Sequence, residues 1–174
     1  GLEKKDLIPY YYPSGEEIEK AKIQSLFLGY FFPWDGYKNY EYAVKHGFKT
    51  YDKWVEGSYG DYENLDNHQT GIHDYFKYLK FGWGRATDIL SMAIRRKKIT
   101  RSQALEIIKE REGKYPSYYL KKSLKDILSD INMTIEEFDI ICDKFTNKDL
   151  FLCNNKGNLI KDEHKNLIKK KYDN

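Results

Sequence analysis

The sequence is poor in cysteine, proline and methionine, and it contains no long apolar run. Cys142 and Cys153 are far apart and have no metal-ligand spacing, so neither a disulfide framework nor a zinc site is expected. A membrane-spanning helix needs about 20 apolar residues, which no segment provides. No signal-peptide pattern opens the chain. These absences predict a protein of the reducing cytoplasm with no membrane span.

The chain also lacks a strong charge of either sign, because 30 Lys and Arg residues nearly balance 27 Asp and Glu residues. Nucleic-acid-binding domains usually have a basic patch and a pI above ~9, whereas the net charge here is +3. The chain has two short basic clusters. Residues 95–98 lie at a predicted helix end, where the helix dipole favours positive charge, and residues 169–171 fit a solvated tail. The composition therefore predicts no nucleic-acid partner.

Apolar residues make up 40% of the chain and charged residues 33%, which suits one domain with a core beneath a very polar surface. Capping boxes mark helix starts, because a Ser or Thr and a Glu or Gln three residues later satisfy each other's backbone donors. They occur at Ser14–Glu17, Thr100–Gln103 and Thr134–Glu137. Helices are predicted over residues 16–27, 35–47, 68–80, 85–97, 100–113, 116–130 and 134–145.

These patterns predict a mainly α fold, with room for one or two short strands before residue 66. No alternating strand pattern follows Asp66, and we expect no repeat of fixed period. The segment Ser25–Trp34 is nearly all apolar and is predicted to be the most buried part of the chain. Without a surface to pack against, it would leave an exposed apolar patch.

The run from Gly57 to Asp88 stands out by its composition. Its 32 positions hold five Gly, five acidic residues, two His, four Tyr and one Trp. A core segment would contain more Leu, Val and Ala, and a solvated segment would contain fewer aromatic residues. Interleaved aromatics, glycines and hydrogen-bonding side chains are expected where a protein faces a ligand. This run is therefore the predicted functional region.

Three acidic residues, Asp61, Glu63 and Asp66, lie in the first half of the run. Close carboxylates can hold Mg²⁺ beside phosphates or act as acid and base. Asp66 or the neighbouring Asn67 can instead cap the following helix, where negative charge is favoured. The spacing alone favours this second interpretation.

Two histidines follow the acidic residues. His68 and His73 are five residues apart, which is not the spacing of a zinc-binding helix. His73 lies next to Asp74, and this pair could transfer a proton or orient a substrate. An ordinary surface histidine explains the same pattern about as well.

Lys80 and the segment Gly82–Arg85 predict an anion site. Two glycines allow the backbone to approach a ligand, and Arg85 lies at a predicted helix start, where free N–H groups attract anions. The guanidinium suits phosphate or carboxylate. A surface ion pair between Arg85 and Asp88, worth ~0–1 kcal/mol, is the alternative, and the anion site is the favoured interpretation.

A family resemblance is carried by the segments SLFLGYFFPWD, YAVKHGFK, GSYGDYENLDN, TGIHDYFKYLKFGWGRATD and IRRKKITRSQALEIIKE. Together they resemble the carboxy-terminal part of the N-acetyl sugar amidotransferases. These are PP-loop ATP-pyrophosphatases of lipopolysaccharide and flagellin-sugar biosynthesis, including that of pseudaminic acid. The similarity covers residues 13–113 and is weaker beyond them.

The resemblance implies a helical carboxy-terminal segment of a PP-loop α/β enzyme. The family's Ser-Gly-Gly-rich loop, which grips the pyrophosphate of ATP, has no counterpart in these residues. We therefore expect the chain to be a segment of a longer enzyme or a truncated relative, inactive by itself. Residues 1–130 are expected to form a helical substrate-side region, and residues 131–174 a helical extension with a basic tail.

The implied reaction converts the acetamido group of a bacterial sugar to an acetamidino group. ATP, with Mg²⁺, would adenylate the acetamido oxygen and release pyrophosphate. Ammonia from a partner glutaminase, delivered through a channel subunit, would then displace AMP. The implied substrate is a nucleotide-activated or acidic N-acetyl sugar.

Residue roles follow from this resemblance and from residue type. The expected catalytic residues are His73, Asp74 and Arg85, and no metal ligand is expected. The expected substrate- or phosphate-binding residues are Asp61, Glu63, Asp66, Lys80, Arg85 and Asp88. The alternative function is a non-catalytic helical module that docks a partner or a carbohydrate through its aromatic residues. RNA binding is a weaker third option, against which the near-neutral charge argues.

Overall fold

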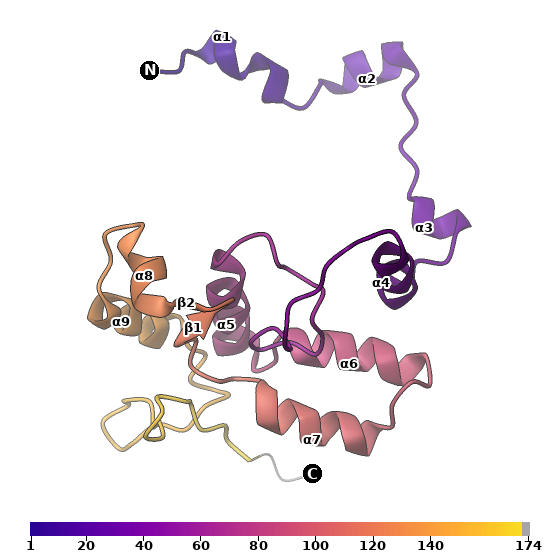
Figure 1. Cartoon of the computed structure of the whole chain (residues 1–174). Coiled ribbons are helices and arrows are strands. Elements are labelled where there is room, and N and C mark those ends of the chain that lie inside the picture. The colour runs from indigo at the N-terminus through magenta and orange to yellow at the C-terminus, as the bar shows by residue number, and fades with distance from the viewer. Residues whose placement is uncertain (172–174) are drawn as a thin grey trace. The chain divides into compact units, whose positions relative to one another are not determined.

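The computed structural model describes residues 1–171, which divide into two compact units, residues 1–43 and residue 44 onwards (Figure 1). Helices dominate, and the only sheet among the described residues is a two-stranded hairpin. The predicted mainly α fold is therefore confirmed. The strands lie at residues 118–123 rather than before residue 66, where the described chain forms no strand.

The first unit is a series of short helices: α1 (Lys4–Leu7), the 3-10 helix η1 (Ile8–Tyr10), α2 (Gly15–Ala21), α3 (Leu28–Phe31) and the start of α4 (Gly36–Lys45). The predicted capping box begins α2, since the Ser14 hydroxyl accepts from the Glu17 N–H and the Glu17 carboxylate accepts from the Ser14 N–H. The helix predicted to reach Phe27 ends at Ala21. It stops there because Lys22 adopts the left-handed conformation that closes helices.

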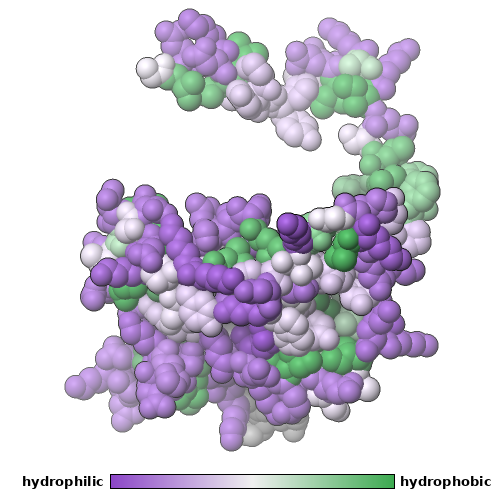
Figure 2. Space-filling view, in the orientation of Figure 1, coloured by the Kyte–Doolittle hydropathy of each residue, from purple (hydrophilic) through white to green (hydrophobic). Residues whose placement is uncertain are grey.

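The apolar segment Ser25–Trp34 is exposed, and its predicted burial is wrong. Phe27 is 90% exposed, Tyr30 88% and Trp34 76%, and apolar side chains of this segment form a green group in Figure 2. The helix α3 within it buries none of its residues. Burial needs a facing surface as well as apolar side chains, and no residue of the first unit covers these.

The helix α5 (Gln69–Phe81) is central to the second unit. It packs on α9 (Ile135–Phe145), which also contacts α8 (Leu124–Ser129), while α6 (Arg85–Arg95) and α7 (Arg101–Arg111) pack on each other (Figure 1). One face of α5 packs into the core, because Tyr75 and Leu79 are buried and Ile72 and Phe76 pack against the same core. Five predicted helices, including those at 35–47, 100–113 and 134–145, are present with ends shifted by one or two residues.

The helix predicted over residues 116–130 is correct only in its second half. Its first half is a hairpin of β1 (Tyr118–Tyr119) and β2 (Lys122–Ser123), paired antiparallel. The two turn residues, Leu120 and Lys121, have φ of 47° and 70°, which matches the turn that two-residue hairpins favour. Such turns normally contain Gly or Asn, so the sequence offered no turn signal. The second half begins α8, where the Ser123 hydroxyl accepts from a backbone N–H.

The loop that precedes α5 is fastened to the end of α7. Val55 N–H donates to the Gly60 carbonyl at 2.8 Å, which folds the loop back on itself. Arg111 Nε donates to the Ser58 carbonyl at 2.7 Å, and its guanidinium lies 4.6 Å from the centre of the Trp54 ring. Segments far apart in the sequence are thereby held beside each other.

The end of the chain contains an eight-residue repeat, FLCNNKGN, LIKDEHKN and LIKKKYDN, which starts at Phe151. The expectation of no fixed repeat is therefore wrong. In the first copy Asn154 Oδ1 accepts from the N–H groups of residues 156 and 158, and in the second Asp162 Oδ1 accepts from those of residues 164 and 166. The last three residues of the third copy lie outside the described part.

The three copies pair with one another in a ring. Leu152 N–H donates to the Ile168 carbonyl, Ile168 N–H to Ile160, and Ile160 N–H to Leu152. The first residue of each copy joins the core; these are Phe151, Leu159 and Leu167. Residues 146–171 contain no helix, so this part of the predicted helical extension is a closed set of turns instead.

Candidate functional site

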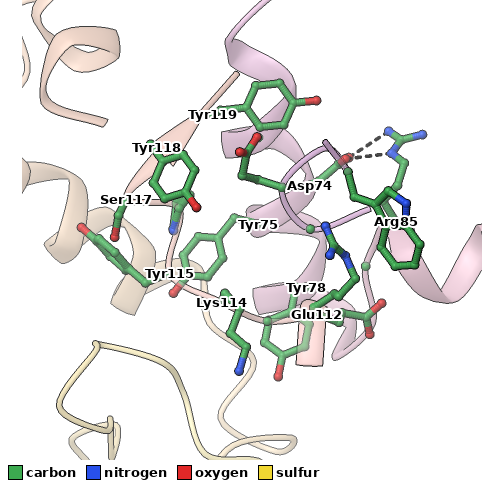
Figure 3. Close-up of a pocket in the computed structure, with 18 of the residues that line it drawn as sticks. Asp74, Tyr75, Tyr78, Arg85, Glu112, Lys114, Tyr115, Ser117, Tyr118 and Tyr119 are labelled. Carbon is green, nitrogen blue, oxygen red and sulfur yellow. Dashed lines mark hydrogen bonds and ion pairs between the residues drawn. The ribbon is translucent and has the colours of Figure 1, made fainter. Parts of the chain in front are cut away.

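A cavity of about 690 Å³ lies within the second unit, beside α5 (Figure 3). Its walls come from the loop at residues 53–57, one face of α5, the start of α6, and the segment 110–119 that runs from α7 into the hairpin. Small-molecule sites usually measure ~300–1,000 Å³. The cavity therefore has the size of a ligand site, and it includes part of the predicted functional run.

The α5 wall consists of four residues spaced as one helical face: Gly71, Asp74, Tyr75 and Tyr78. A Cβ atom at Gly71 would lie 2.5 Å from Cδ2 of Tyr119. The Tyr119 ring therefore packs directly on the helix backbone, and its hydroxyl donates to the Asn64 carbonyl at 3.2 Å. Glycine at this position lets the hairpin close against α5.

Asp74 and Arg85 form a bidentate ion pair at the cavity wall (Figure 3). Arg85 Nε donates to Asp74 Oδ2 at 2.8 Å, and Nη2 donates to Oδ1 at 2.9 Å. The hydrogen bond to Asp74 raises the pKa of Arg85. His73 Nδ1 lies 3.1 Å from Asp74 Oδ1, and the His73 side chain is 74% exposed. The structure thus brings the three predicted catalytic residues together, with Asp74 in the middle.

The N-terminus of α6, where an anion was predicted, is occupied by a carboxylate of the protein itself. Glu112 Oε2 accepts from the Thr87 N–H at 2.9 Å, and Oε1 accepts from the Thr87 hydroxyl at 2.9 Å. A Cβ atom at Gly84 would come within 3.3 Å of the Glu112 side chain. The helix start therefore attracts negative charge as expected, but an external anion would have to displace Glu112.

Of the six residues expected to bind substrate or phosphate, only Arg85 lines the cavity, and Lys80 and Asp88 are two of those that lie outside it. Lys80 Nζ lies 4.9 Å from the centre of the Phe145 ring, because residue 80 is nine positions after Gly71 and so faces the opposite side of a helix with 3.6 residues per turn. Asp88 pairs with Lys77. The alternative surface pair of Arg85 with Asp88 is replaced by the Asp74 pair.

The acidic loop lies just before α5 and makes its hydrogen bonds at the start of that helix. Burial raises the pKa of Glu63, while the positive charge of Arg85 opposes this shift. Asp66 accepts from the Asn67 side chain at 3.3 Å, and Asn67 Oδ1 accepts from a first-turn N–H of α5 at 3.0 Å. Asp61, Glu63 and Asp66 do not line the cavity. The loop therefore caps α5, which is the interpretation that the spacing favoured.

Aromatic side chains form much of the cavity wall. Tyr75 and Tyr78 are 6% and 7% exposed, and burial raises the pKa of Tyr78 to about 12 and raises the pKa of Tyr75 as well. Both are therefore neutral phenols at physiological pH. Tyr115 instead donates to Asp139 at 2.6 Å. Apolar ring faces beside hydroxyl and charged groups suit a ligand with both C–H and polar surfaces, such as a sugar.

Sequence reasoning missed most of the cavity, because 13 of its 20 lining residues lie outside the run from Gly57 to Asp88. The missed lining residues include Trp54, Glu56, Arg111, Glu112, Lys114, Tyr118 and Tyr119. A signal was present, since residues 111–119, REGKYPSYY, mix glycine, tyrosine and charge as the run from Gly57 does. The helix predicted from residue 116 concealed it.

Within residues 1–171, no group of three or more His, Cys, Asp or Glu side chains is placed to hold a metal ion. Of the carboxylates that line the cavity, Asp74 is paired with Arg85, Glu56 lies 3.5 Å from Lys53, and Glu112 accepts from Thr87. With these partners the three carboxylates do not form a set of Mg²⁺ ligands. In the same part of the chain, no helix combines the length and apolar character needed to span a membrane.

Comparison with protein families shows a match to the family described as LPS biosynthesis protein WbpG-like, C-terminal domain, over residues 37–162. The matched residues are most of the chain and include every residue that lines the cavity. No curated protein matches the sequence.

Proposed function

Because the chain belongs to the WbpG-like C-terminal domain family of LPS biosynthesis proteins, we propose that it is the substrate-side part of an ATP-dependent amidotransferase. The family places it in LPS sugar biosynthesis. In the proposed reaction, an N-acetyl sugar, ATP and ammonia give the acetamidino sugar, AMP and pyrophosphate. The family match supports the pathway, and the resemblance to N-acetyl sugar amidotransferases supports the reaction.

The observation that carries the proposal is the aromatic-walled cavity with the Asp74–Arg85 pair at its wall. Tyrosine rings can pack against the apolar C–H face of a sugar ring. A carboxylate has about four acceptor positions and a guanidinium has five donors, so both groups retain hydrogen-bonding capacity for sugar hydroxyl or amide groups. His73 does not line the cavity, so the part proposed for it is to hold the Asp74 carboxylate from outside.

We assign ATP and Mg²⁺ to another part of the complete enzyme. These residues contain no Ser-Gly-Gly-rich loop, and the carboxylates near the cavity do not fit a metal ion. Ammonia would come from a separate glutaminase through a channel subunit, in the cytoplasm. The role proposed for this chain is to bind and orient the sugar, for which the acidic or nucleotide-activated forms are the candidates.

The test uses the complete enzyme from the full reading frame, with pyrophosphate release measured against sugar and ammonia. We expect release to require both, and Arg85→Ala to abolish it while circular dichroism shows an intact fold. Lys125→Gln, an exposed lysine outside the cavity, is the matched control and should retain activity. A reading frame without an ATP-binding loop, or full activity in Arg85→Ala, would contradict the proposal.

The docking module is retained as a second candidate because one observation favours it, the exposure of Phe27, Tyr30 and Trp34. Monomeric proteins rarely expose apolar patches larger than a few hundred Å². Under this candidate, a triple Ser substitution of these residues would abolish partner capture and leave sugar binding unchanged. Under the amidotransferase proposal, cavity substitutions abolish sugar binding.

A further inference from the structure

The loop at residues 53–57 forms one wall of the cavity, and its residues Trp54 and Glu56 both line that wall. Val55, between them, is 1% exposed and packs in a core cluster with Tyr119. Its carbonyl accepts from the Ser58 N–H at 3.1 Å and from a side-chain nitrogen of Arg111 at 3.2 Å. The loop is therefore anchored at its middle, and the two residues beside the anchor are kept at the cavity.

Trp54 is an exposed aromatic residue that its neighbours hold in place. It is 41% exposed, although its ring lies 4.8 Å from the Tyr59 ring, centre to centre, at 73°. The guanidinium of Arg111 lies over the indole, 4.6 Å from its centre, and is itself bonded to backbone carbonyls. An indole held in this way can pack against a ligand with little loss of side-chain freedom.

Glu56 carries a carboxylate of which only one oxygen has a hydrogen bond. Oε2 accepts from the Leu120 N–H in the hairpin turn at 3.0 Å. Oε1 is buried and has no hydrogen-bond partner in the described part of the chain, which is uncommon for a buried polar atom. The Lys53 ammonium lies 3.5 Å from Oε1, and the Lys53 side chain is 49% exposed. A ligand donor can therefore reach this oxygen if the lysine moves aside into water.

The other carboxylates of the cavity differ from Glu56. Asp74 accepts two hydrogen bonds from Arg85, and Glu112 accepts two from Thr87. Glu110 lies in the exposed class, where water can satisfy its oxygens. Among the described residues that line the cavity, Glu56 is thus the acidic side chain that is fixed in place and still needs a donor.

We propose that Trp54 and Glu56 form the subsite for the sugar ring. The indole packs against the C–H face of the ring, and Glu56 Oε1 accepts a hydrogen bond from a hydroxyl or amide N–H of the same sugar. The inference rests on the proposed function for the sugar itself. It goes further by assigning the ring to a loop outside the run from Gly57 to Asp88.

The test is an NMR titration of the ¹⁵N-labelled chain with N-acetylglucosamine, N-acetylmannosamine and N-acetylgalactosamine. The indole N–H signal of Trp54 should shift as the sugar binds. Trp83 is the internal reference, because it is 40% exposed, has the Lys77 ammonium over its ring and does not line the cavity. Its signal should stay where it is.

Substitutions then locate the subsite. Trp54→Leu and Glu56→Gln should each weaken binding of the preferred sugar at least about fivefold. Glu56→Gln keeps an oxygen acceptor for the Leu120 N–H, so its spectrum should show an intact fold. Trp83→Leu and Glu136→Gln, an exposed residue outside the cavity, are the matched controls and should bind as wild type does.

The outcomes separate this inference from the proposed function. A sugar that binds without shifting the Trp54 signal, or with unchanged affinity in either cavity variant, would overturn the subsite and leave the proposed function standing. Failure of all three sugars to bind would contradict both.

Discussion

The Asp74–Arg85 ion pair is predicted to stabilise the second unit as well as to shape the site. Replacing Arg85 with Gln leaves the Asp74 carboxylate, which is 12% exposed, without its ionic partner. Losing one partner of a fully buried pair costs ~3–5 kcal/mol, whereas an exposed pair is worth ~0–1 kcal/mol. Because Arg85 is 28% exposed, water can reach part of the pair, and we expect a loss of about 2–3 kcal/mol.

The assay is urea unfolding at pH 7, followed by circular dichroism, for Arg85→Gln, Asp74→Asn and the double variant. The coupling energy from this cycle should exceed about 1 kcal/mol. Lys109→Gln is the control, because it removes the exposed Lys109–Glu106 pair and should cost less than about 0.5 kcal/mol. The reasoning is refuted if Arg85→Gln unfolds at the same urea concentration as this control.

Three further predictions follow from the packing and charges of the site. Gly71→Ala should destabilise the chain by about 1–3 kcal/mol in urea unfolding. Alanine normally favours a helix, but here its methyl group would collide with the Tyr119 ring. A gain in stability would contradict that contact. Glu112→Ala should cost about 1–2 kcal/mol as a lost cap of α6, and should let inorganic phosphate raise the melting temperature more than in wild type, while Glu110→Ala should do neither. Burial raises the pKa of Glu63 in the folded chain. The folded state is therefore favoured below the unfolded pKa of ~4.3, where Glu63 is protonated, and loses stability as the pH rises through the folded pKa. Glu63→Gln should be more stable than wild type at pH 7 and lose that advantage in acid, and a stability difference that does not change with pH would argue against burial as the cause.

Local signals in the sequence predicted most helices. The capping boxes at Ser14, Thr100 and Thr134 each begin a helix in the structure, because a cap depends only on residues three apart. The same local reasoning failed at Leu120 and Lys121, because neither residue type usually adopts the positive φ found there. Turn residues that break the usual preference are invisible to propensity, so the hairpin was mistaken for a helix.

Contacts between distant segments could not be derived from the sequence. Asp74 and Arg85 were both singled out, but their pairing across the break after α5 depends on how α6 packs. Glu112 reaches the start of α6 from a loop 25 residues farther along, and no spacing rule connects the two. The charge chemistry of the α6 start was predicted correctly, whereas the group that satisfies it came from outside the predicted run.

The apolar segment Ser25–Trp34 shows the limit of composition as a measure of burial. Its side chains are apolar enough for a core, but the first unit provides no surface that covers them. The terminal repeat shows the opposite case. Its period is readable in the sequence from Asn158 and Asn166, which are eight residues apart, but its structure depends on hydrogen bonds between the copies. In both cases, tertiary packing decides what the pattern means.

The central claim is that this chain binds the sugar of an acetamido-to-acetamidino conversion. The most direct measurement is mass spectrometry of the sugar after incubation of the complete enzyme with ATP, an N-acetyl sugar and ¹⁵N-labelled ammonia. The account predicts an acetamidino product that carries the ¹⁵N label, formed by wild type and not by Arg85→Ala. Recovery of the sugar with its acetamido group intact, under conditions in which the enzyme is folded and binds ATP, would contradict it.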